Sequence, residues 1–385
     1  MSHSPFGDIS VEEFLRDYWQ KKPLLVRNAF PDIEAPVGAD ELAGLSCEEE
    51  VESRLVIQKP NSDHWELKQG PFDEDTFSDL PESHWTLLVQ AVDHWVPEAS
   101  EIVEQFRFIP NWRYDDLMVS FASKDGGVGP HYDNYDVFLI QTQGKRRWEI
   151  GGHFDQNSPR RSDTPVMIIP DWTPEQVWIL EPGDMLYIPP QVGHNGIGET
   201  DDCMTYSVGF RAPSHAEIMR SFTDFIGEKL TSEFRYNDPD LALQENPGEI
   251  KPEALDKVRA IFTDYLQDDA RLAKWLGEYV TDPKYPDINQ AAEEQIDAVQ
   301  LREALKSGDL HFCRNEGSRF SYSIRSQQAL QLFVDGNCFE VSESACALAT
   351  TLCQNPAIVI SQGDWTEAQL KLLADLYNQG SLYIE

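Results

Sequence analysis

Two residues that could hold a metal ion stand close together in a glycine-rich stretch. His131 and Asp133 lie at the end of GGVGPHYD, residues 126–133. Side chains at positions i and i+2 of an extended chain point to the same side, so both can face one point inside a folded domain. Asp136 would face the opposite side of a regular strand and is the poorer carboxylate candidate. The preceding glycines leave room for a bend and for close approach of another backbone segment.

A third candidate ligand, His194, follows 63 residues after His131 (194 − 131 = 63) and ends the stretch EPGDMLYIPPQVGH. The Pro-Gly-Asp turn at 182–184 starts a strand whose end delivers this histidine. Two imidazoles and one carboxylate form a facial triad, which suits iron(II) and leaves positions open for a co-substrate and dioxygen. A closed structural zinc site would use a fourth protein ligand, usually Cys or His. The sequence therefore predicts an iron(II) centre at these three residues.

An oxygenase that uses 2-oxoglutarate also needs a cation for the distal carboxylate of this co-substrate. Arginine binds carboxylates best, through its planar fork, and the stretch GKRRW at 144–148 offers candidates. Strand alternation allows Arg146 to face inward while Lys145 and Arg147 face solvent, or the reverse. Ser120, in the apolar run 117–121, could donate its hydroxyl to the same carboxylate, although an ordinary strand serine explains it equally well.

The elements that must position these residues are mostly short strands. Between about residues 115 and 213, apolar runs with a period of two alternate with Gly and Pro turns, which is typical of a β-sandwich or barrel. The predicted strands are 117–121, 137–141, 147–150, 177–180, 185–188 and 204–210. Ahead of them, a capping box at Ser10 predicts a helix to about Tyr18, Pro23 to Val26 reads as a strand, and apolar spacing predicts a second helix at 85–95.

The rest of the chain changes character. Helices are predicted at 214–234 and 252–280, and a proline-containing linker follows at 283–286. From about residue 289, a hairpin at 332–341 with an Asp-Gly turn, helices at 344–352 and 365–377 and a strand at 381–384 suggest a winged-helix module. This module has no basic stripe, so we expect it to contact protein and not DNA.

Composition limits the possible partners. The 385 residues carry 67 acidic and 31 basic side chains, a net charge of −36. This balance argues against a site for bare nucleic acid. It serves solubility and also favours a basic protein partner. The sequence shows neither a signal-peptide pattern nor an apolar run of membrane-spanning length. Its six scattered cysteines form no CxxC pair, so we expect free thiols in a reducing cytoplasm.

Several stretches together resemble the bacterial ribosomal oxygenases, which are JmjC proteins. The resemblance is carried by GGVGPHYDNYDVFLIQTQGKRRWEI, EPGDMLYIPPQVGHNG and TYSVGFRAP, with further similarity in FLRDYWQKKPLLVRNAF and WTLLVQAVDHWVPE. It covers nearly the whole chain and is weakest after about residue 235. The family pattern GRRRW is GKRRW here, which leaves Arg146 in place.

The resemblance implies an α+β architecture in three parts. These would be a double-stranded β-helix (JmjC or cupin barrel) with N-terminal helices at 1–213, a helical dimerisation region at 214–285 and a winged-helix-like domain at 286–385. His131, Asp133 and His194 would be the catalytic iron ligands, and Arg146 and Ser120 would bind 2-oxoglutarate. The implied reaction, with iron(II) as cofactor and 2-oxoglutarate and dioxygen as co-substrates, hydroxylates the β-carbon (3-position) of an arginine in a large-subunit ribosomal protein.

The resemblance also favours a homodimer. The apolar positions Ile218, Phe222, Phe225 and Ile226 need a surface to cover them, either in the same chain or in a second copy. Two alternatives keep the fold but change the reaction: a JmjC histidine hydroxylase or a lysine demethylase. A third is non-enzymatic, a metal-binding cupin that acts as a ribosome-associated adaptor. Arg146 distinguishes a 2-oxoglutarate oxygenase from this last alternative, because a cupin with a purely structural metal needs no buried arginine.

Overall fold

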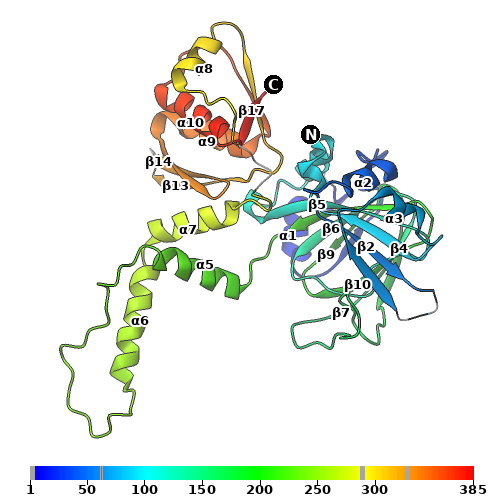
Figure 1. The fold of residues 1–385 in the computed structure, drawn as a ribbon, viewed down its shortest axis with the longest axis horizontal. Helices are drawn as coiled ribbons and strands as arrows, with labels where there is room; N and C mark the ends of the chain where they lie inside the picture. The colour runs from blue at the N-terminus through cyan, green and yellow to red at the C-terminus, as the bar shows by residue number, and fades with distance from the viewer. Residues whose placement is uncertain (1–4, 61, 63, 287–290, 327–328) are drawn as a thin grey trace. The chain divides into compact units, whose positions relative to one another are not determined.

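The computed structural model of the protein describes residues 5–60, 62, 64–286, 291–326 and 329–385. The chain divides into two compact units, Met1–Ala212 and Pro213–Glu385 (Figure 1). The first unit contains all five predicted site residues.

The first unit is built on a large antiparallel sheet of eight strands. Their order is β1-β9-β6-β11-β5-β4-β2-β3. In chain order the bounds are β1 Leu24–Val26, β2 Ser53–Gln58, β3 Trp65–Gln69, β4 Trp85–Val89, β5 Tyr114–Ala122, β6 Asp136–Gln143, β9 Met185–Ile188 and β11 Cys203–Phe210. All six strands predicted between residues 115 and 213 are present, although their ends differ by up to three residues.

A second sheet of three strands, in the order β10-β7-β8, faces part of the first. Its strands are β7 Arg146–His153, β8 Gln176–Leu180 and β10 Val192–Gly198. One apolar cluster joins Val137 and Leu186 of the large sheet to Trp148, Ile150 and Leu180 of the small one. This cluster fills the interior between the sheets, and the arrangement confirms the expected double-stranded β-helix.

The opposite face of the large sheet is covered by the N-terminal segments. Phe14, Leu42 and Ile102 from three short helices share one cluster with Phe138 and Tyr206 of the sheet. The large sheet is thus buried on both faces, which holds it rigid behind the site. The helical elements of this unit are α1 Val11–Asp17, α2 Ala39–Leu45, α3 Glu74–Ser78, α4 Ser100–Glu104 and the 3₁₀ turns Val92–His94, Pro97–Ala99 and Asn111–Arg113.

The prediction of a helix at 85–95 is wrong. Residues 85–89 form the central strand β4, which pairs with β2 and β5. Four of these five residues are buried, and a strand covered on both faces is apolar throughout, so its pattern does not distinguish it from a buried helix. Only Val92–His94 turns helical, after Ala91 adopts a positive φ of 48°.

The second unit begins with three helices: α5 His215–Gly227, α6 Pro252–Leu266 and α7 Asp269–Thr281. The long helix predicted at 252–280 is therefore two helices, because Asp268 caps a new one by accepting from the backbone N–H of Arg271. Phe222 and Ile226 of α5 are buried against Trp275 of α7. Part of the predicted apolar face of α5 is thus covered within the chain.

The C-terminal part combines three helices with two small sheets of three strands, β16-β12-β17 and β13-β14-β15. The Asp335-Gly336 turn joins β14 and β15 with positive φ at both residues, which confirms the predicted hairpin. The predicted start of this part, at about residue 289, lies outside the described residues. The bounds are α8 Ala298–Ala304, β12 Leu310–Arg314, β13 Phe320–Ser326, β14 Ala329–Val334, β15 Asn337–Ser342, α9 Glu343–Gln354, β16 Ala357–Ile360, α10 Glu367–Asn378 and β17 Leu382–Ile384.

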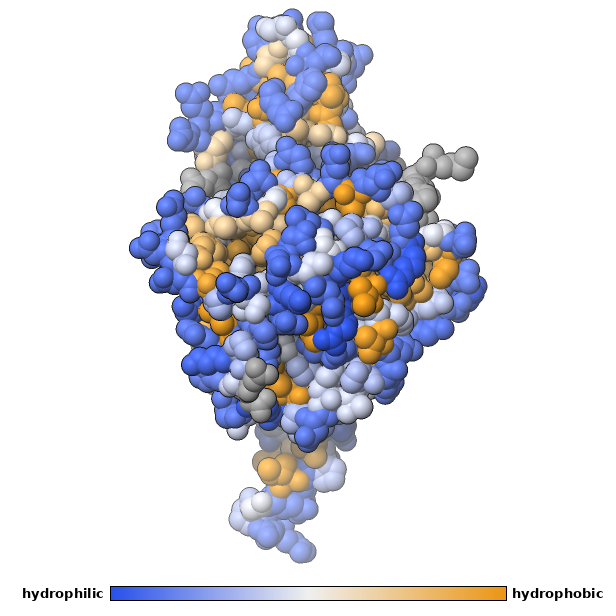
Figure 2. Space-filling model, turned by 90° about the vertical axis from the view of Figure 1, so that its right-hand side faces the viewer, coloured by the Kyte–Doolittle hydropathy of each residue, from blue (hydrophilic) through white to orange (hydrophobic). Residues whose placement is uncertain are grey.

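The surface agrees with the charge balance. The face shown in Figure 2 is mainly hydrophilic, and hydrophobic residues appear on it in small separate groups. Among the described residues, no helix combines the length and the apolar character that crossing a membrane requires.

Candidate metal centre and co-substrate site

Backbone pairing brings the two histidines together from segments far apart in the chain. His131 donates its N–H to the carbonyl of His194 at 2.9 Å, and His194 donates to the carbonyl of His131 at 2.8 Å. The glycines before His131 permit this approach. A Cβ atom on Gly127 would lie 2.5 Å from the carbonyl oxygen of Gly196, too close for any other residue.

Each imidazole is oriented by its own backbone neighbourhood. Nδ1 of His131 lies 2.8 Å from the carbonyl oxygen of Gly129, and Nδ1 of His194 lies 2.9 Å from that of Val192. A carbonyl only accepts hydrogen bonds, so both Nδ1 atoms carry the proton and both Nε2 atoms keep a free lone pair. This tautomer is the one that binds a metal through Nε2.

The carboxylate of Asp133 completes the cluster. Its Oδ2 atom lies 3.5 Å from Nε2 of His194 and 4.0 Å from Nε2 of His131. One ligand atom from each of the three residues falls within 4.8 Å of the others. The three atoms thus converge on one point, as the sequence predicted, and among the described residues no further His, Cys, Asp or Glu belongs to this group.

The electrostatics of the cluster favour metal binding. Burial, helped by the neighbouring His194, lowers the pKa of His131 to about 4, so the ring is neutral near pH 7. Burial alone would raise the pKa of Asp133, but the neighbouring imidazoles of His194 and His131 lower it overall. A neutral imidazole at His131 and an ionised carboxylate at Asp133 are the protonation states in which these groups bind a divalent cation.

The nearby carboxylate of Asp136 takes no part in this cluster. It is fully buried and accepts hydrogen bonds from Tyr187 at 2.7 Å and Gln20 at 2.9 Å, and it forms an ion pair with Arg113 at 3.1 Å. These contacts tie the N-terminal segment to the barrel. Asp136 is a structural residue, which agrees with its prediction as the poorer ligand candidate.

Arg146 is the member of the GKRRW stretch that faces the interior. It is 3% exposed, and its Nη1 atom donates to Ser120 Oγ at 3.0 Å and to Thr205 Oγ1 at 3.3 Å. Nε has no partner, and in the described chain no carboxylate pairs with this guanidinium. Lys145 and Arg147 point the other way, where they pair with Glu181 at 2.6 Å and Glu199 at 2.7 Å.

These residues fit an iron ion and a 2-oxoglutarate molecule. The triad offers the ligand set that suits iron(II) and leaves coordination positions open. Burial lowers the pKa of Arg146, yet a guanidinium stays charged in proteins, and an unpaired buried charge is costly. A carboxylate delivered by a ligand would relieve that cost. Ser120, whose hydroxyl contacts the guanidinium, lies where it could share the same carboxylate.

Three residues beside this site were not singled out in the sequence. Thr205 faces Ser120 across β5 and β11. Trp148, two residues after Arg146 on one strand face, has a buried indole N–H without a partner. Tyr135 neighbours Asp133 and helps to lower the pKa of its carboxyl. The period-two spacing from Arg146 and from Asp133 could have identified Trp148 and Tyr135, whereas Thr205 depends on the pairing of distant strands.

Comparison with known proteins agrees with the geometry. The family model described as the JmjC domain matches residues 101–218, and the ROXA-like winged helix matches residues 264–383. The Escherichia coli ribosomal protein uL16 3-hydroxylase is 37% identical over 77% of this chain and 78% of its own length. A probable ribosomal oxygenase from Haemophilus influenzae is 32% identical over 85% of this chain and 81% of its own length.

Solved structures extend the likeness to the whole chain. YcfD, a ribosomal oxygenase from Escherichia coli in complex with cobalt and succinic acid, matches with a TM-score of 0.85 and 33% identity over 98% of this chain and 99% of that one. The same protein in complex with cobalt and 2-oxoglutarate gives a TM-score of 0.85 at 32% identity, with the same coverage. With a triad and a buried arginine in this fold, the chain belongs to the JmjC ribosomal oxygenases, a family of iron(II)- and 2-oxoglutarate-dependent enzymes.

Proposed function

We propose that the chain hydroxylates the β-carbon (3-position) of an arginine in the large-subunit ribosomal protein uL16. The E. coli relative is named for 3-hydroxylation of uL16. The observation in this chain that carries the proposal is the buried Arg146, which lies behind an open metal triad and has no carboxylate of the described chain beside it. The net charge of −36 suits a basic ribosomal protein.

Each site residue has a distinct task in this proposal. His131, Asp133 and His194 hold iron(II), and the backbone carbonyls behind the two imidazoles fix their orientation. Arg146 and Ser120 hold the distal carboxylate of 2-oxoglutarate. The bound iron supplies the oxidising chemistry, in which 2-oxoglutarate and dioxygen give succinate, carbon dioxide and one oxygen atom inserted into a C–H bond. The apolar residues around Trp148 exclude water from the reaction.

We further propose that two copies associate through the helical region 214–285, between the catalytic part at 1–213 and the winged-helix-like part at 286–385. Helix α6 has no buried residue. Leu255, Val258, Ile261, Phe262 and Leu266 of this helix are between 42% and 56% exposed, and an amphipathic helix needs a partner for such a face.

A direct assay tests the reaction. The purified protein is incubated with iron(II), 2-oxoglutarate and uL16 in air, and tryptic peptides are compared by mass spectrometry. We expect one arginine-containing peptide to gain the mass of one oxygen atom, and the gain to disappear without 2-oxoglutarate. A gain on histidine would replace arginine as the target, and loss of a methyl group from lysine would indicate a demethylase. The proposed substrate places the activity in the cytoplasm.

A further inference from the structure

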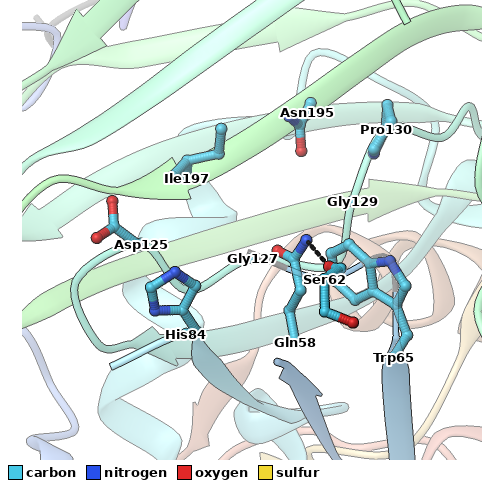
Figure 3. Close-up of a pocket in the computed structure, with 10 residues that line it drawn as sticks. All are labelled: Gln58, Ser62, Trp65, His84, Asp125, Gly127, Gly129, Pro130, Asn195 and Ile197. Carbon is cyan, nitrogen blue, oxygen red and sulfur yellow. Dashed lines mark hydrogen bonds between the residues drawn. The ribbon is translucent and has the colours of Figure 1, made fainter. Parts of the chain in front are cut away.

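A cavity of about 560 Å³ opens beside the metal centre in the first unit (Figure 3). Its wall includes Pro130 and Asn195, the residues directly next to the ligands His131 and His194. Gly129, whose carbonyl orients His131, also lines it. The cavity thus borders the backbone that carries both histidine ligands, and it is separate from the co-substrate site, where Arg146 would hold 2-oxoglutarate inside the barrel.

The wall of the cavity carries an exposed acidic side chain that pairs with no other side chain of the described residues. Asp125 lines it, and in the described chain its carboxylate has neither a hydrogen bond nor an ion pair, whereas its N–H donates to the carbonyl of Gly198 at 2.8 Å. The backbone of Asp125 has a positive φ of 61°, a conformation that costs free energy and that tends to persist at functional sites. The carboxylate is thus held at the cavity in a fixed backbone position.

His84 lies next to Asp125 in the cavity, apart from Trp65 (Figure 3). It also has a positive φ, 69°. Its N–H donates to the carbonyl of Lys124 at 2.9 Å, its carbonyl accepts from the N–H of Gln58, and its Nδ1 lies 2.7 Å from Ser83 Oγ. These bonds join the β2–β3 hairpin to the loop of Asp125, so two separate segments fix this end of the cavity.

The chemistry of the lining selects a cation. None of the ten lining residues is lysine or arginine, so nothing in the wall neutralises Asp125. Trp65 offers an aromatic ring, which attracts cations through its π face, and Gln58 and Asn195 contribute amide groups. The carboxylate of Asp125 at one end of the cavity fits the ammonium or guanidinium group of a basic side chain, and the amide groups and Trp65 line the wall farther along.

We propose that this cavity binds a second basic side chain of the substrate, a few residues from the one that is hydroxylated. This inference rests on the proposed function, because it takes a segment of a basic ribosomal protein as the occupant. An extended chain advances about 3.3 Å per residue, so a side chain two to four residues away reaches about 7–13 Å from the target. The cavity would then select the sequence around the target and would take no part in the oxidation.

The test measures peptide binding without turnover. Overlapping fluorescent peptides that together cover uL16 are titrated anaerobically with the iron- and 2-oxoglutarate-loaded protein, and anisotropy gives Kd. Asp125→Asn keeps the side-chain shape, and Asn tolerates positive φ. For the tightest-binding peptide we expect its Kd to rise at least about fivefold. The matched control is Asp171→Asn, at an exposed aspartate that also has positive φ (52°) and does not line the cavity, with a change below about twofold.

A double-mutant cycle then identifies the partner of Asp125. Basic residues of the peptide are changed one at a time to glutamine. At one position the change should weaken binding to the wild-type protein, whereas the same change should have no further effect on binding to the Asp125→Asn protein. Additive losses at every position, or no uL16 peptide that binds, would overturn the proposal. Hydroxylation of the same peptide in air is scored separately. Coupling without hydroxylation contradicts the proposed reaction alone, and hydroxylation without coupling contradicts only this subsite.

Discussion

Arg146 and Ser120 contact each other at 3.0 Å inside the barrel, and the guanidinium has no carboxylate of the described chain beside it. The contact joins β7 of the small sheet to β5 of the large one. Gly196 makes room for it, since a Cβ atom there would lie 2.8 Å from Nε of Arg146. A buried guanidinium between the two sheets is costly when no carboxylate pairs with it. We therefore infer that a ligand supplies the missing carboxylate.

The first prediction follows from that unpaired charge. Arg146→Met should stabilise the ligand-free protein by about 1–4 kcal/mol, since an apolar chain of similar volume removes a buried charge. In this variant the Ser120 hydroxyl can still donate to the carbonyl of Thr205, and the Thr205 hydroxyl can still donate to Gln141. In the same variant the free energy of 2-oxoglutarate binding should be less favourable by about 2–5 kcal/mol. Urea unfolding and calorimetric titration measure the two effects.

Arg147→Ala is the control for this prediction, because Arg147 pairs with Glu199 on the outer side. It should change 2-oxoglutarate binding little. If Arg147→Ala weakened that binding as much as Arg146→Met did, the co-substrate would not lie where we place it.

The second prediction separates a ligand carboxylate from a structural one. Asp133→Ala should abolish iron binding and turnover while the fold remains, because an open triad has no spare ligand. Asp136→Asn should instead destabilise the fold by about 3–5 kcal/mol, since one amide oxygen cannot accept from the three donors around Asp136. Metal analysis of the folded fraction should find iron in Asp136→Asn and none in Asp133→Ala. The reverse distribution of iron would refute the assignment.

The third prediction concerns Tyr135, whose hydroxyl helps to lower the pKa of Asp133. Tyr135→Phe removes only the hydroxyl, so the carboxylate loses a group that orients it toward the metal. Residues behind a metal ligand typically contribute about 10- to 100-fold in affinity. We expect iron affinity, measured by competition with a chelator, to fall in that range while 2-oxoglutarate still binds to Arg146. An unchanged iron affinity would show that Tyr135 does not act through Asp133.

The fourth prediction concerns assembly. Light scattering of the wild type should give twice the monomer mass. Leu255→Glu combined with Phe262→Glu places charges on the exposed face of α6 and should give monomers. Val299→Glu, at an exposed apolar residue of α8 in the same unit, should leave the mass doubled. A wild-type protein that stays monomeric at micromolar concentration would contradict the proposed pairing.

Local patterns in the sequence were enough to predict most of the site. The i, i+2 spacing of His131 and Asp133 and the turn before His194 depend on neighbours in the chain, so they could be read directly. The inward direction of Arg146 could not, because alternation allows two facings and only the strand register settles which one occurs. The contact of Arg146 with Thr205 likewise depends on strands about sixty residues apart, which local pattern does not reveal.

The error at 85–95 has the same origin. Burial on both faces of β4 removes the polar residues that would mark a strand, so an apolar run with helical spacing remains. The exposed carboxylate of Asp125 was missed for another reason. Its importance depends on a cavity built from the β2–β3 hairpin and the segment 125–130, and the sequence predicted neither strand of that hairpin.

The most direct test of the account follows the oxygen atom. The protein is supplied with iron(II), 2-oxoglutarate, uL16 and isotopically labelled dioxygen, and succinate and hydroxylated peptide are quantified together. The account predicts one labelled oxygen on the β-carbon of an arginine for each succinate formed above the level without uL16, and no product with Asp133→Ala. Hydroxylated arginine without the label, or full turnover by Asp133→Ala, would contradict it.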